Sequence, residues 1–127
     1  MKIVSWNCQG KFREKYLQLE SLKADLYVIQ ECENPARKPS KYENFFINYI
    51  WIGSNQNKGL GVFAKSTISL KKNLWKNFSW REFLSVKVNN TFNLLGIWAC
   101  KPYIEEYYIY QEINYQKYDS NMIIIGD

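Results

Sequence analysis

The sequence predicts a mixed α/β domain, and three observations lead to this prediction. A strand–helix–strand pattern fills the N-terminal quarter of the chain, and a helical pattern followed by an apolar strand fills its end. Between them lie short apolar segments separated by glycine and asparagine, which is typical of antiparallel strands. We therefore expect a mixed sheet of about six strands with helices on one face.

The composition limits the class of protein to which the chain can belong. The chain has 127 residues, of which 46% are hydrophobic and 23% charged, as in one ordinary globular domain. We expect residues 1–127 to form that single domain. The N-terminus lacks the apolar core of a signal peptide, and no stretch reaches the roughly 18 apolar residues of a membrane span. We therefore expect a soluble cytoplasmic protein.

The first elements form a crossover unit. Residues 2–7 have the alternating pattern of a strand that ends at Asn7. Residues 24–31 predict a second, apolar strand that ends at Glu31. Between them, residues 11–24 show the period of an amphipathic helix, with apolar side chains at Phe12, Tyr16, Leu19 and Leu22. Such a crossover leaves the two strands parallel, so we expect Asn7 and Glu31 to be neighbours at one sheet edge.

The middle of the chain reads as a loop followed by strands. Residues 32–45 carry two prolines and three basic side chains, Arg37, Lys38 and Lys41. This segment is either a solvated loop or a basic loop that meets phosphates. Residues 45–54 predict one or two strands and residues 59–66 another. Residues 83–99 predict a hairpin that turns at Asn89-Asn90, because asparagine tolerates the positive φ of tight turns.

The C-terminal elements repeat the crossover pattern. Residues 104–118 predict a helix, with acidic residues in the first turn and Ile104, Tyr108 and Tyr115 on one apolar face. An apolar strand then ends in Gly-Asp. A second crossover would bring Asp127 to the same sheet edge as the ends of the first two strands.

Oxygen ligands would then meet at one place. Two carboxylates, from Glu31 and Asp127, and the amide of Asn7 match the preference of a hard cation, Mg²⁺ or Mn²⁺. Each residue taken alone can also be a turn or cap residue at a strand end.

Five segments, taken in order, resemble a known family. They are "KIVSWNCQG", "LKADLYVIQE", "KGLGVFAKS", "NLLGIWA" and "MIIIGD". Together they resemble the endonuclease/exonuclease/phosphatase superfamily, which includes deoxyribonuclease-like enzymes and abasic-site endonucleases. The resemblance implies that the chain is the N-terminal half of a four-layer α/β sandwich, ending inside the family's Gly-Asp-x-Asn motif.

The resemblance also implies roles for particular residues. The chain would be a Mg²⁺-dependent phosphodiester or phosphoester hydrolase of nuclease type, or the N-terminal portion of one. Asn7 would help to position metal and phosphate, and Glu31 would be the principal metal ligand. Asp127 would orient or deprotonate the attacking water. Lys101 or Tyr103 would contact phosphate where many members carry histidine or tyrosine, unless they have a plain loop role.

The chain also departs from the family pattern. It contains no histidine, so the family's C-terminal histidine segment is missing from it. If each half of the family fold supplies one sheet, a lone half would leave an apolar sheet face uncovered. We therefore expect self-association or a complementary C-terminal half. The alternatives are a split enzyme, or a catalytically inactive half-domain that binds phosphate, nucleic acid or protein.

Charge and cysteine content add little to this choice. The formal net charge of +5 favours polyanions, such as nucleic acid or a small phosphoester substrate, or serves solubility alone. The three cysteines, Cys8, Cys32 and Cys100, are expected to be buried fillers rather than a soft-metal site. No Cys-x-x-Cys pair supports a disulfide or zinc framework.

Overall fold

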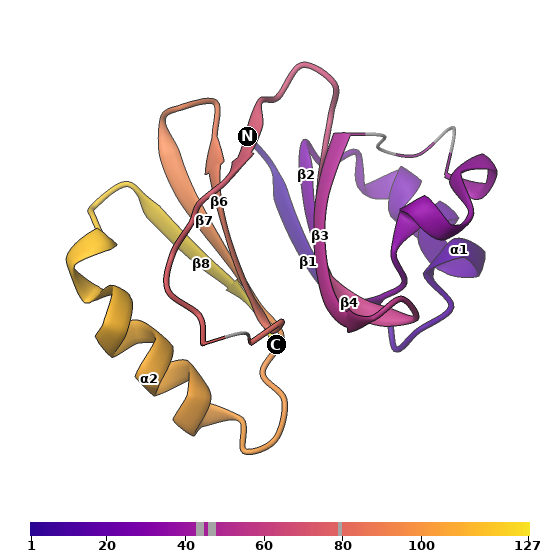
Figure 1. Ribbon diagram of the computed structural model, residues 1–127. Coiled ribbons are helices and arrows are strands. Elements are labelled where there is room, and N and C mark those ends of the chain that lie inside the picture. Colours follow the sequence, from indigo (N-terminus) through magenta and orange to yellow (C-terminus); the bar gives the residue numbers. More distant parts are fainter. Residues whose placement is uncertain (43–44, 46–47, 79) are drawn as a thin grey trace.

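The chain forms four layers (Figure 1), seen in a computed structural model that describes residues 1–42, 45, 48–78 and 80–127. In the described part of the chain, two mixed sheets of four strands each face one another, and helices cover both outer faces. The predicted α/β class and the sandwich implied by the resemblance are confirmed. The expected single sheet of about six strands with helices on one face is instead two sheets covered on both sides. The reason is that the chain leaves the first sheet after Ala64 and starts a second one.

The first sheet has the strand order β1-β2-β4-β3. Its strands are Ile3–Asn7 (β1), Leu26–Cys32 (β2), Asn48–Asn55 (β3) and Lys58–Ala64 (β4). The first crossover is as predicted, because β1 and β2 pair in parallel with Asn7 opposite Gln30. Strand β4 pairs antiparallel with both β2 and β3, so its first residues lie beside the end of β2.

The second sheet has the order β5-β6-β7-β8. Its strands are Leu70–Lys72 (β5), Phe83–Val88 (β6), Phe92–Ile97 (β7) and Met122–Gly126 (β8). The predicted hairpin turn is confirmed, with φ of 50° at Asn89 and 55° at Asn90. The second crossover is also present, because β8 pairs with β7 in parallel.

The main core lies between the two sheets. Aliphatic side chains from both inner faces pack there, among them Leu26, Val28, Leu60, Val62, Leu84, Val86 and Leu94, all fully buried. Our expectation of an uncovered apolar sheet face is therefore wrong for the inner faces. This one chain supplies both sheets, and each covers the other.

The outer face of the first sheet is covered by α1 (Phe12–Lys15) and three 3₁₀ helices. These are Tyr16–Leu22, Pro35–Arg37 and Pro39–Lys41. The predicted helix over 11–24 is thus mostly 3₁₀. Of its predicted apolar face, Leu19 is buried as expected, whereas Leu22 is 38% exposed. Phe12 is fully buried at the centre of this layer. Its ring contacts those of Trp6, Tyr16, Tyr42, Phe45 and Phe63.

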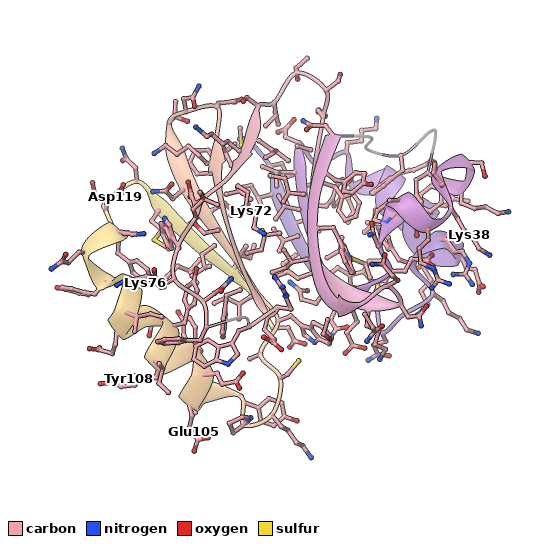
Figure 2. All side chains as sticks on the ribbon, viewed as in Figure 1. Lys38, Lys72, Lys76, Glu105, Tyr108 and Asp119 are labelled. Atoms are coloured by element: carbon pink, nitrogen blue, oxygen red, sulfur yellow. The ribbon has the colours of Figure 1, made fainter. Side chains whose placement is uncertain are left out.

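Helix α2 (Ile104–Asn114), continued by the 3₁₀ helix Tyr115–Lys117, covers the second sheet. The predicted apolar face is wrong, because Ile104, Tyr108 and Tyr115 are 73%, 61% and 73% exposed. Figure 2 shows Tyr108 and Glu105 projecting away from the sheet. Tyr110 faces the sheet instead and stacks on Phe83 at 4.6 Å. Apolar and aromatic residues occur all around this helix, so their spacing did not single out one face.

Part of the predicted loop and strand falls outside the described residues. This applies to positions 43, 44, 46 and 47, at the end of the loop predicted over 32–45 and the start of the strand predicted over 45–54. Within the rest of that loop, Pro35–Arg37 and Pro39–Lys41 form two short 3₁₀ helices that begin at proline. Among the described residues, no helix is both long enough and apolar enough to cross a membrane.

Candidate active site

The carboxyl ends of β1, β2 and β8 meet at one place. The Asn7 amide nitrogen Nδ2 donates to Glu31 Oε1 at 3.1 Å and to Asp127 Oδ2 at 2.6 Å. Asn7 and Glu31 come from the first sheet, whereas Asp127 follows the last strand of the second. The three side chains therefore meet as expected, but across the gap between two sheets rather than along one sheet edge.

A local irregularity of β2 directs Glu31 to this place. The register of β2 against β4 shifts between Gln30 and Cys32, and Glu31 in the bulge has a φ of 58°. Gln30 and Cys32 on either side are fully buried, while the Glu31 side chain is 20% exposed. A non-glycine residue in this region costs about 1–3 kcal/mol, and bulges near functional sites commonly re-aim a side chain. The strained backbone of Glu31 thus belongs to a residue whose carboxylate is turned toward solvent.

Asn7 holds the two carboxylates together. Its Oδ1 accepts a hydrogen bond from the backbone N–H of Gln9 at 3.0 Å, which leaves Nδ2 facing the two acids. For Asn7 to offer oxygen to a cation, the amide would have to turn over. The loop behind it is fixed by Lys15, whose Nζ donates to the carbonyl of Cys8 at 2.6 Å.

Lys58 is the fourth member of the site, and sequence reasoning missed it. Its Nζ lies 2.8 Å from Glu31 Oε2. This contact, helped by the Asn7 amide and opposed by partial burial, holds the pKa of the Glu31 carboxyl below its usual value and raises the pKa of Lys58. The available signal was the segment "KGLGVFAKS". If that strand pairs antiparallel with β2, its first residue must lie beside the end of β2.

The donor set fits a hard divalent cation. Mg²⁺ is usually held by one or two carboxylates together with waters, and Glu31 and Asp127 supply two carboxylates bridged by one amide. Within the described part of the chain, no group of three or more His, Cys, Asp or Glu side chains has metal-binding geometry. The Lys58 ammonium already forms an ion pair with Glu31, so one positive group is present beside this carboxylate.

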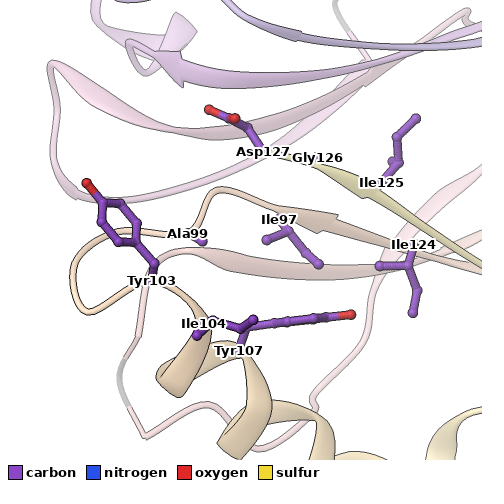
Figure 3. A pocket seen from close by; sticks show the side chains of 9 residues that line it. All are labelled: Ile97, Ala99, Tyr103, Ile104, Tyr107, Ile124, Ile125, Gly126 and Asp127. Carbon is purple, nitrogen blue, oxygen red and sulfur yellow. The ribbon is translucent and has the colours of Figure 1, made fainter.

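A cavity of about 320 Å³ adjoins the site (Figure 3). Asp127 and Tyr103 line it together with apolar side chains from β7, β8 and α2, including Ile97, Ile104 and Ile124. Tyr103 thus lies near one of the predicted catalytic groups. Lys101 sits on the exposed turn before α2 and makes no described hydrogen bond or ion pair with the site. The phosphate-binding roles of Lys101 and Tyr103 stay predictions.

Two of the three cysteines are buried, as expected for small core fillers. Cys8 and Cys32 belong to the aromatic core beneath α1, where burial raises the pKa of both thiols. Cys100 is half-buried, and burial also raises its pKa. All three are free thiols.

Solved structures of phosphoester-cleaving enzymes share this fold. The chain matches a 3'-5' exonuclease from Neisseria meningitidis with a TM-score of 0.72 and 15% identity, covering 100% of this chain and 57% of that one. It matches an AP endonuclease from Archaeoglobus fulgidus with a TM-score of 0.68 and 13% identity, covering 100% and 56%. It matches a mannosyl-6-phosphatase from Bacteroides thetaiotaomicron with a TM-score of 0.62 and 14% identity, covering 100% and 64%.

These similarities define the class of fold. The chain has the fold of these exonuclease, AP endonuclease and phosphatase structures over part of their length. It spans somewhat more than half the length of the first of these structures. No family model and no curated protein sequence matches the chain.

Proposed function

We propose that this chain carries the metal-binding half of a Mg²⁺-dependent phosphoester hydrolase, with Mn²⁺ as an alternative ion. One observation supports this most strongly: Asn7 bridges the carboxylates of Glu31 and Asp127 across the two sheets. A fold can carry many activities, so the proposal depends on this group of side chains rather than on the likeness to nucleases alone.

Each residue has a distinct part in the proposed reaction. A bound Mg²⁺ would supply charge neutralisation at the phosphoryl oxygens. Glu31 would hold the ion, and the Asn7 amide would fix the angle between the two carboxylates. Asp127, which lines the adjoining cavity, would accept the proton of the attacking water. Tyr103 on the cavity wall and Lys101 on the preceding turn would contact the phosphate.

The proposed substrates are nucleic acids or small phosphoesters. Among proteins of similar fold, a 3' phosphatase from Neisseria was solved bound to a product DNA hairpin. The formal charge of +5 is also favourable for a polyanion. The alternative, a binding module without turnover, would show DNA affinity that falls with salt and no cleavage with any divalent ion.

We further propose that a complementary C-terminal half completes the site. Strands β1 and β8 are edge strands of their sheets, and both end at the site. On β8, Ile123 and Ile124 are 39% and 42% exposed, so this apolar edge strand is only partly covered. Structures of similar fold are nearly twice as long, so a further segment beside β1 and β8 is the occupant that fits, ahead of a second copy of this chain.

Cleavage assays test the proposed activity. The protein would be assayed on bis(p-nitrophenyl) phosphate, p-nitrophenyl phosphate and an abasic DNA duplex, with Mg²⁺, Mn²⁺ or EDTA. Asp127→Asn should lower the metal-dependent rate by roughly 10²–10⁴-fold, and Glu31→Gln should also weaken Mg²⁺ binding. Glu112→Gln, which changes an exposed carboxylate on α2, is the control. Metal-dependent cleavage that survives Glu31→Gln would remove this residue from the mechanism.

The same assay separates the alternatives. Turnover that appears only after a complementary polypeptide is added would identify a split enzyme. Salt-sensitive DNA binding without turnover under any of these conditions would identify a binding module.

A further inference from the structure

The Glu31 carboxylate is held from both sides. Its Oε1 accepts from the Asn7 amide, and its Oε2 accepts from the Lys58 ammonium at 2.8 Å. Within the described part of the chain, Lys58 is the only cationic side chain in ion-pair contact with either Glu31 or Asp127. The oxygen that Lys58 occupies is therefore the one that Asn7 leaves available for a metal ion.

The backbone of Lys58 is fixed, whereas the end of its side chain is free to move. Lys58 is the first residue of β4, whose next residue, Gly59, pairs with Cys32 of β2. Its stem passes over the loop after β1, where a Cβ on Gly10 would come within 4.0 Å of Lys58 Cε. The side chain is 52% exposed, and a lysine ammonium has three rotatable donors on a flexible stem. The tip can therefore change partners while the backbone stays beside the site.

A divalent cation on Glu31 would force such a change. Two positive groups cannot share one carboxylate oxygen without mutual repulsion, so Lys58 must give up its contact. The oxygens of a phosphate held at the same place offer it an equivalent charge-assisted hydrogen bond. The ammonium then exchanges one anionic oxygen for another a short distance away.

We propose that Lys58 is a further phosphate-contacting residue of this site, paired with Glu31 until a metal ion takes its place. This inference rests on the proposed function and adds a residue to it. It explains why a lysine from the β3–β4 hairpin forms an ion pair with a predicted metal ligand. It also predicts that removal of Lys58 has opposite effects on metal affinity and phosphate affinity.

Binding measurements test the proposal without relying on activity. Mn²⁺ affinity would be measured by electron paramagnetic resonance, and affinity for inorganic phosphate by calorimetry in saturating Mg²⁺. Lys58→Met should bind Mn²⁺ about two- to fivefold more tightly, because a competing exposed ion pair is removed. It should bind phosphate roughly tenfold more weakly. Lys58→Arg should retain phosphate binding, which a purely structural role would not predict.

Two matched variants serve as controls. Lys65→Met removes a similarly exposed lysine that pairs with Asp25 far from the site, and should change neither affinity. Lys71→Met removes an exposed lysine from β5, and should change metal affinity less than Lys58→Met does.

Each outcome decides the proposal. Unchanged Mn²⁺ or phosphate affinity in Lys58→Met, or equal effects from Lys71→Met, would overturn the role of Lys58 while leaving the metal site in place. No Mn²⁺ binding by the wild-type protein would overturn both this inference and the proposed function.

Discussion

At the scale of single residues, the candidate site depends on one amide between two negative charges. Asn7 is the shared donor, and an acid in its place would put a third carboxylate within hydrogen-bond distance of the other two. Like charges that share a site strongly disfavour joint ionisation. The identity of this one side chain therefore controls whether the site is stable without a bound metal ion.

We predict that Asn7→Asp destabilises the metal-free protein and makes it more responsive to Mg²⁺. The loss in EDTA should be about 1–2 kcal/mol, from two lost hydrogen bonds to charged groups that are only partly buried. Added Mg²⁺ should recover more of the unfolding free energy in the variant than in wild type. Urea unfolding with EDTA and with Mg²⁺ measures both. Equal stability in EDTA would show that Asn7 does not hold the acids together.

A second residue-scale prediction concerns pH and Asp25, far from the site. Lys65 Nζ donates to Asp25 Oδ1 at 2.6 Å, and the backbone N–H of Lys2 donates to Oδ2 at 2.7 Å. These contacts, that of Lys65 foremost, hold the pKa of Asp25 below 3.8. Because the folded pKa is the lower one, the stabilisation is present above pH 3.8 and is lost as the pH falls through the folded value.

Comparison of wild type with Asp25→Asn measures this effect. The stability difference should be constant near neutral pH, shrink below pH 3.8, and vanish once Asp25 is protonated in the folded protein. A difference that persists unchanged into acid would mean that the carboxylate charge is not its source.

At the scale of elements, an ion pair fastens α1 to the segment that follows β2. Arg13 Nη1 lies 2.5 Å from Glu33 Oε2, and the Tyr42 hydroxyl donates to Glu33 Oε1 at 2.7 Å. The Glu33 side chain is only 5% exposed. Because Glu33 follows Glu31 by two residues, this contact also supports the end of the strand that carries the site.

We predict that Arg13→Met costs about 1–3 kcal/mol of unfolding free energy, since it leaves a buried carboxylate without its cation. Lys65→Met, which breaks an exposed pair, should cost under about 1 kcal/mol. The double variant Arg13→Met with Glu33→Gln should recover part of the loss. Urea denaturation followed by tryptophan fluorescence compares the three. Equal losses in both single variants would mean that burial of Glu33 does not matter.

The elements also show what could be predicted from sequence. Strands that end in polar residues, and the helical segments between them, were recognisable, so the meeting of Asn7 with Glu31 followed from the parallel crossover. The division into two sheets did not follow, because residue periodicity identifies strand faces but not which strands pair. Lys58 was missed for the same reason, since its place beside Glu31 depends on β4 pairing with β2.

At the scale of the whole molecule, the spacing between the sheets sets the geometry of the site. Glu31 belongs to one sheet and Asp127 follows the other, so any change in their separation moves the two carboxylates relative to each other. Gly96 of β7 lies where the sheets approach closely. A Cβ built there would meet Val28 Cγ1 at 3.0 Å and Leu60 Cδ2 at 3.7 Å.

We therefore predict that Gly96→Ala pushes the sheets apart and affects both stability and the site. Val28 is fully buried and β-branched, so it cannot move aside easily, and overpacking of this kind costs about 1–3 kcal/mol. Mn²⁺ affinity should fall along with stability, because Glu31 and Asp127 would move apart. Adding Val28→Ala removes the clashing methyl group and should recover metal affinity further than stability, since it relieves the strain but loses buried apolar contacts. Urea unfolding and Mn²⁺ binding on the single and double variants give both quantities. If Gly96→Ala lowered stability and left Mn²⁺ affinity unchanged, the site would not depend on the spacing of the sheets.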